Sequence, residues 1–110
     1  MINLEKTLKG LGACSEYIDK YKGKSLKEAW NTCRNEGDMH WFICALHYKK
    51  VLTDQTYNLV NCAYEYGARI AKKYRNTYKV PQEMPYVLNA CRSMRLVVSY
   101  RTILRAVNKL

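Results

Sequence analysis

Three side chains that can bind a transition metal lie along one face of a predicted helix. His40, Cys44 and His47 follow one another at spacings of four and three residues, which places them on one helical stripe. Imidazole nitrogen and thiolate sulfur are both zinc ligands. Structural zinc sites usually draw ligands from close pairs such as C-x₂₋₄-C, and this sequence contains none. We therefore expect no cofactor, and keep zinc at these three residues as the less favoured alternative.

The sequence carries no signature of catalysis. A Cys-His pair needs a third group to orient the base and a hole for the oxyanion. A glycine-rich phosphate loop, a G-x-S-x-G elbow and a zincin helix are absent from the sequence, and its nine acidic residues form no obvious pair. We predict that the protein is not an enzyme.

Positive charge is concentrated in the second half of the chain. Residues 1–55 hold nine basic and seven acidic residues, a net charge of +2, whereas residues 56–110 hold ten basic and two acidic residues, a net charge of +8. An asymmetry of this kind indicates a polyanionic or acidic partner for the second half.

Two predicted helices of the second half each carry a basic face. In the last helix the apolar residues from Leu96 onward fall on one arc and the basic residues on another. If both helices turn their basic faces the same way, these faces form one patch with tyrosines between them. The predicted partner-binding residues are Arg69, Lys72, Lys73, Tyr74, Arg75, Arg95, Tyr100, Arg101, Arg105 and Lys109.

Four interpretations of this basic face compete. It can be an ordinary solvated surface, or an interface with an acidic protein, to which arginine and tyrosine are well suited. It can also hold the phosphates of RNA or DNA. A membrane surface is disfavoured, because the apolar arc of the last helix is needed for the core.

The helix that would position the metal-binding stripe is also the predicted centre of the core. We expect Gly37 to end the preceding helix in the left-handed conformation and Asp38 to cap the next one. The central helix then runs from Met39 to about Lys50. Its apolar residues Met39, Phe42, Ile43 and Leu46 recur at three- and four-residue spacing on one face.

Other helix signals fill the rest of the chain. Short helices are predicted near residues 4–11 and 13–21, and Ser25 with Glu28 forms a capping box for a third. Thr53 begins a long helix, and Pro81 or Pro85 opens a last helix that reaches nearly to Leu110. The prediction is a single all-α domain over residues 1–110, a compact bundle of about five or six helices.

The chain shows no sign of a membrane or secretory location. It has no apolar run of the roughly 20 residues that span a bilayer and no recognisable signal peptide at its start. We expect a cytoplasmic protein. Its five cysteines, an odd number, mostly neighbour alanine, so we expect reduced, buried packing residues.

Several spaced elements resemble an immunity-protein-like family of small helical phage and bacterial proteins. The resemblance covers most of residues 11–95. It consists of an Ala-Cys pair, an Ala-Trp-x-x-Cys helix, a Gly-Asp pair before an aromatic-rich helix, a later Cys-Ala pair, and a proline-containing turn before the final helix. These elements are Ala13-Cys14, Ala29-Trp30-x-x-Cys33, Gly37-Asp38, Cys62-Ala63 and Pro81 to Ala90.

One departure from the family pattern indicates what the motif does. The family has tryptophan where this chain has Met39 and Phe42. Both replacements are apolar, so the motif is expected to build core. The resemblance implies an accessory protein of a phage or mobile element, acting in the cytoplasm of a bacterial host. It would bind and inhibit another macromolecule, either a toxin or a defence nuclease, as an anti-CRISPR protein does.

Overall fold

Seven α-helices and no strand make up the part of the chain that the computed structural model describes. That part is the backbone of residues 2–78 and 85–110, with the side chains of residues 2–66, 69 and 90–110. The predicted all-α single bundle is confirmed, with more helices than expected. The helices are α1 Leu4–Gly10, α2 Ser15–Lys20, α3 Leu26–Thr32, α4 Glu36–Tyr48, α5 Asp54–Tyr78, α6 Pro85–Val97 and α7 Tyr100–Asn108.

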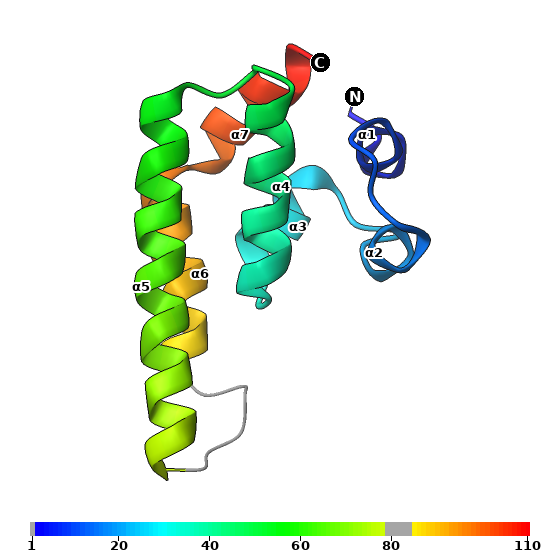
Figure 1. Ribbon diagram of the computed structural model, residues 1–110. Coiled ribbons are helices and arrows are strands. Elements are labelled where there is room, and N and C mark those ends of the chain that lie inside the picture. The colour runs from blue at the N-terminus through cyan, green and yellow to red at the C-terminus, as the bar shows by residue number, and fades with distance from the viewer. Residues whose placement is uncertain (1, 79–84) are drawn as a thin grey trace.

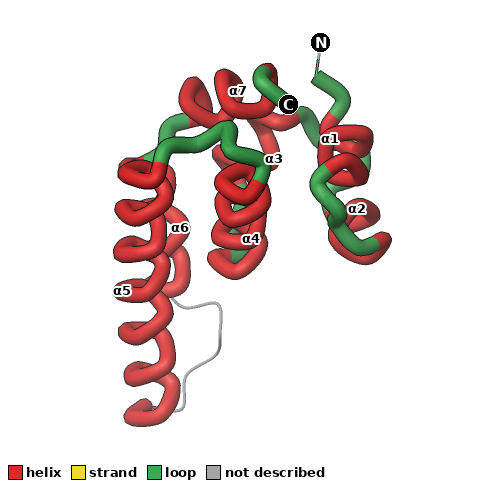
Figure 2. The backbone as a smooth tube through the Cα atoms, turned by 45° about the horizontal axis from the view of Figure 1, so that its top comes forward, coloured by secondary structure: helices red, strands yellow, loops and turns green. Residues whose placement is uncertain are grey.

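The two longer C-terminal helices form one side of the molecule. α5 and α6 lie side by side, and α4 packs against both of them (Figure 1). The small α1–α2 pair lies on the far side of α4, and α7 crosses the end at which α5 begins (Figure 2). α7 also packs against α3, so segments near both ends of the sequence meet at this end of the bundle.

The apolar face of α4 lies at the centre of the core, as predicted. Met39 and Phe42 are buried, and Ile43 and Leu46 are fully enclosed. α6, α7 and the connection between them contribute further enclosed side chains to the same cluster, at Met94, Ile103 and Val98 respectively.

Several predicted helix boundaries are confirmed by cap contacts. The Ser25 hydroxyl accepts a hydrogen bond from the backbone N–H of Glu28 at 3.1 Å, and the Thr53 hydroxyl accepts from the N–H of Thr56 at 3.2 Å. Gly12 ends the α1 turn with a φ of +87°, a conformation that suits glycine. These caps satisfy backbone donors that would otherwise lack a partner.

The predicted boundary at Gly37 is wrong. α3 already ends at Thr32, and α4 begins at Glu36 with Asn35 as its cap. The Asn35 side chain accepts from the backbone N–H of Asp38 at 2.9 Å. Gly37 therefore lies inside the first turn of α4. The carboxylate of Asp38 is left free for contacts with α2.

The predicted continuous last helix is also wrong, because the chain breaks between α6 and α7. Ser99 has extended backbone angles and its hydroxyl accepts from the N–H of Thr102 at 3.4 Å, which starts α7. The carbonyl of Val98 accepts instead from the indole nitrogen of Trp30 at 3.0 Å. A contact from α3 thus takes a carbonyl that a continuous helix would have used internally.

Candidate interaction surface

The exposed side of α7, together with its C-cap residue Lys109, carries three basic residues in one line. Arg101, Arg105 and Lys109 follow one another at spacings of four residues, and all three side chains are exposed. Residues four apart are neighbours on a helix surface, so these cations form one stripe, here called the α7 basic stripe. The opposite side of α7 is buried, at Ile103, Ala106 and Val107.

Two apolar side chains are exposed at the corner where α6 ends. Leu96 is 87% exposed and Val97 is 36% exposed. Both residues were predicted to lie on the buried arc of a continuous helix, and this prediction is wrong because the break at Ser99 interrupts that helix. The corner is flanked along the chain by two exposed cations, Arg92 and Arg101.

Arg95 points into the protein, contrary to its predicted place on the basic face. One guanidinium nitrogen donates to the carbonyl oxygen of Cys33 at 2.9 Å and to that of Trp30 at 3.3 Å. These carbonyls belong to the C-terminal end of α3, where no helical N–H is available to them. The half-buried Arg95 side chain therefore caps α3 from α6.

Two of the remaining predicted residues, Arg69 and Tyr100, lie off the α7 basic stripe. Arg69 is exposed, but it belongs to the second half of α5, which runs away from the end where α7 lies (Figure 1). Tyr100 is half-buried beside α3. Lys72, Lys73, Tyr74 and Arg75 lie outside the residues whose side chains are described.

The α7 basic stripe lies in an acid-free stretch of the chain. From Met84 to Leu110 the sequence contains no Asp or Glu. Among the described side chains, the pairs of opposite charge are Lys9 with Glu5, Lys20 with Asp38, and His47 with Asp54. None of them involves α7, so the positive charge of this helix is not neutralised by those acids.

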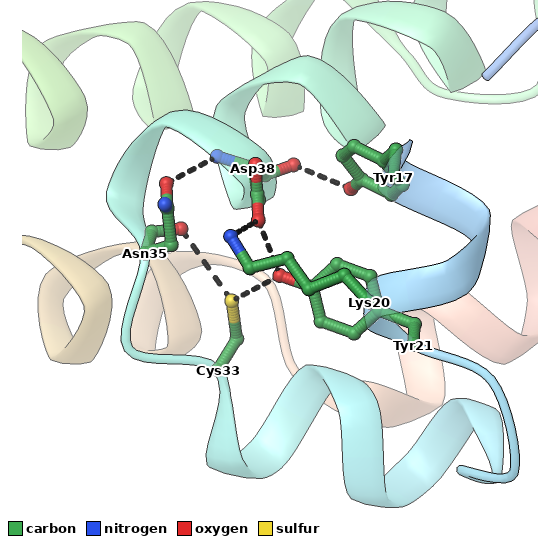
Figure 3. Close-up of polar contacts among 6 residues, drawn as sticks. All are labelled: Tyr17, Lys20, Tyr21, Cys33, Asn35 and Asp38. Carbon is green, nitrogen blue, oxygen red and sulfur yellow. Dashed lines mark hydrogen bonds and ion pairs between the residues drawn. The ribbon is translucent and has the colours of Figure 1, made fainter. Parts of the chain in front are cut away.

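A separate polar cluster joins α2 to the start of α4 (Figure 3). One carboxylate oxygen of Asp38 accepts from the Tyr21 hydroxyl at 2.6 Å and from the Lys20 ammonium at 2.7 Å. The Tyr17 hydroxyl donates to the backbone carbonyl of Asp38 at 2.8 Å. The Tyr21 hydroxyl also lies 3.3 Å from the sulfur of Cys33.

Both tyrosines of this cluster are held neutral. Burial, with the Asp38 carboxylate adding to it, raises the pKa of Tyr17 and of Tyr21 far above the ordinary value of 10. A phenol that stays protonated is a hydrogen-bond donor, not a base. Because Tyr21 and Cys33 are also buried, we interpret the cluster as a structural contact that holds α2 against the start of α4.

The two histidines of the predicted metal-binding stripe contact α5, and the Cys44 sulfur lies 3.6 Å from Nε2 of His40. His40 lies 2.7 Å from the Asn61 amide oxygen and stacks on Tyr64. His47 lies 2.7 Å from an Asp54 carboxylate oxygen and stacks on Tyr57, with ring centroids 3.9 Å apart. Among the described side chains, no group of three His, Cys, Asp or Glu residues is arranged to hold a metal ion.

The five cysteines are free and differ in burial. Cys33 and Cys91 are buried as predicted, but Cys14 and Cys62 are exposed, so the prediction of packing residues is wrong for those two. Burial raises the pKa of the Cys91 thiol to about 11, with the nearby Cys33 adding to the shift and Arg95 opposing it. This thiol is therefore protonated and unreactive at neutral pH.

Comparisons with protein-family models, curated proteins and solved structures found no match to this chain. Within the described residues, no helix combines the length and the apolar character needed to cross a membrane.

Proposed function

We propose that this protein is a non-enzymatic binding protein that holds an acidic surface of another protein through the α7 basic stripe and the neighbouring α6–α7 corner. The observation that carries the proposal is the α7 basic stripe itself. Three exposed cations lie in line on a helix within a stretch that contains no acid. Complementary charge of this kind steers association and disfavours partners of the same sign.

The exposed apolar residues favour a protein over a nucleic acid as the partner. Leu96 and Val97 lie beside the cations along the chain and are open to solvent. Apolar side chains of this size contribute to the centre of protein interfaces, whereas nucleic-acid binding depends mainly on many phosphate contacts. RNA or DNA is therefore the alternative ligand, held by the same basic face.

The resemblance to immunity-protein-like phage and bacterial proteins supports a more specific role. It favours an accessory protein of a phage or mobile element that blocks a toxin or a defence nuclease in the bacterial cytoplasm, in the manner of an anti-CRISPR protein. The chemistry is compatible with such a target, because metal-dependent nucleases hold their ions with clustered carboxylates. A cationic helix can bind such a cluster and obstruct it.

A pull-down from bacterial lysate tests the proposal. The bait is the full chain, and the two comparison variants each reverse two exposed cations. Arg101→Glu with Arg105→Glu alters the α7 basic stripe. Lys22→Glu with Arg34→Glu makes the same charge change in the connections after α2 and α3, where both side chains are exposed.

The proposal expects one acidic protein to be captured by the wild type and the control variant and lost with the α7 variant. Nuclease treatment of the lysate should leave this capture unchanged. Capture that disappears after nuclease treatment would identify nucleic acid as the ligand and overturn the protein-partner proposal. Equal capture by the α7 variant would show that the α7 basic stripe is not the contact surface.

A further inference from the structure

A hollow of about 390 Å³ lies between the beginning of α3 and the outer side of α7. It is open to solvent. It adjoins the α7 basic stripe because two of its lining residues, Leu104 and Asn108, belong to α7. Its lining residues are Ile2, Ser25, Leu26, Tyr100, Leu104 and Asn108.

The floor of this hollow is apolar. Leu26 is 4% exposed, and Tyr100 and Leu104 are half-buried against the core. The Ser25 hydroxyl is already engaged as the cap of α3. An apolar cavity of roughly 150 Å³ is enough to hold a benzene ring, so the space here accommodates one large apolar side chain.

Exposed cations flank the lining residues of the hollow along both helices, and these cations are here called its rim. Lys24 and Lys27 flank the lining residues of α3, and Arg101 and Arg105 flank Leu104 on α7; all four side chains are exposed. One exposed acid, Glu28, lies in the same turn of α3. The packing of α3 against α7 thus combines cations that are more than 70 positions apart in the chain.

We propose that this hollow receives one apolar side chain from an acidic segment of the partner protein. This side chain is here called the anchor. The carboxylates on either side of the anchor bind the cations of the rim. This inference rests on the proposed function and adds the anchor to it. An apolar anchor in a pocket surrounded by charge pairs is a common arrangement of a protein interface.

Two synthetic peptides test the anchor. The probes are acetyl-EEELEEE and acetyl-EEESEEE, which have the same charge and differ only at the central residue. Each is titrated into the ¹⁵N-labelled full chain at low salt and followed by NMR. We expect the leucine peptide to bind about tenfold more tightly, since it alone can bury an apolar side chain. The amide signals of Leu26, Tyr100 and Leu104 should move most.

Two variants that fill the hollow complete the test. Leu104→Trp occupies the floor, and Asn108→Trp closes the mouth from an exposed position where folding is not at risk. With either variant, the affinity for the leucine peptide should fall to that of the serine peptide. The affinity for the serine peptide should stay as it is with the wild type. Arg101→Glu with Arg105→Glu should instead weaken the binding of both peptides.

The outcomes separate the two proposals. Equal affinity of the wild type for the two peptides would overturn the anchor and leave the cationic surface standing, provided that the double reversal still weakens binding. If the double reversal left the affinity for both peptides unchanged, the proposed function would fail together with the anchor.

Discussion

Trp30 and Arg95 exchange hydrogen bonds between the end of α3 and the end of α6. The Trp30 indole donates to the carbonyl of Val98 at 3.0 Å, and the Arg95 guanidinium donates back to the carbonyl of Trp30 at 3.3 Å and to that of Cys33 at 2.9 Å. Each residue thereby satisfies the terminal carbonyls of the other's helix. The Trp30 contact coincides with the end of α6 at Val97. The contacts of Arg95 with the two α3 carbonyls turn its side chain away from solvent.

Replacing Arg95 should cost stability and leave binding intact. Arg95→Met keeps the length of the side chain but leaves part-buried carbonyls without their donor, which should lower the free energy of unfolding by about 2 kcal/mol. Arg92→Met, at an exposed position of the same helix, is the control and should change it by less than about 0.5 kcal/mol. Urea unfolding measures both. Equal effects of the two variants would show that the Arg95 contacts are not structural.

Core truncations should be far more costly than surface ones. Trp30 is 4% exposed and Phe42 is 6% exposed, so Trp30→Ala or Phe42→Ala should each lower the free energy of unfolding by about 3–5 kcal/mol. Leu96→Ala removes an apolar side chain that is 87% exposed and should have little effect. A loss for Leu96→Ala as large as that for Phe42→Ala would mean that the corner is packed, not exposed.

The break between α6 and α7 predicts the sign of a single substitution. Ser99 caps α7, so Ser99→Ala should lower the free energy of unfolding by about 1 kcal/mol. If α6 and α7 formed one helix, the same change would raise stability slightly, because alanine is the better helix former. Ser93→Ala, inside α6, is the matched control and should be neutral or slightly stabilising. Thermal unfolding followed by circular dichroism distinguishes these outcomes.

The contact between Tyr21 and Asp38 predicts a loss of stability in alkali. Burial and the Asp38 carboxylate raise the pKa of Tyr21 in the folded protein, so the unfolded chain loses this proton first as the pH rises. The contribution to stability is therefore fully present below about pH 9. Above pH 10 it falls by about 1.4 kcal/mol per pH unit for one such group.

Urea unfolding at pH 8, 10 and 11 measures this slope. Tyr21→Phe should make the decline above pH 10 less steep. Tyr48→Phe should not change it, because Tyr48 is 83% exposed. Cys91 titrates in the same range in every variant, so the difference between variants isolates the tyrosine. An unchanged slope for Tyr21→Phe would contradict a stabilising contact between the Tyr21 hydroxyl and the Asp38 carboxylate.

Periodicity and caps predicted most of the fold. The apolar spacing around Phe42 identified the central helix correctly, and the caps at Ser25 and Thr53 lie where expected. The errors came from tertiary contacts. Asp38 was expected to cap α4, but Asn35 caps it and the Asp38 carboxylate instead accepts from Lys20 and Tyr21.

The candidate surface was predicted only in part, for the same reason. The spacing of Arg101, Arg105 and Lys109 within one helix was readable from the sequence. The break at Ser99 depends on a contact between Trp30 and Val98, 68 positions apart. Ser99 is a residue type that often caps helices, and this was a usable signal for the start of α7. Lys24 and Lys27 lie near the candidate site only because α3 packs against α7. No local sequence pattern predicts that packing.

The affinity of the captured partner for the charge variants tests the central claim most directly. With the partner purified, titration calorimetry gives Kd for the wild type, for Arg101→Glu with Arg105→Glu, and for the control Lys22→Glu with Arg34→Glu. Our account predicts that the α7 variant raises Kd by about a hundredfold or more and that the control stays within about threefold of the wild type. An α7 variant that folds normally and binds with the wild-type Kd would contradict the account.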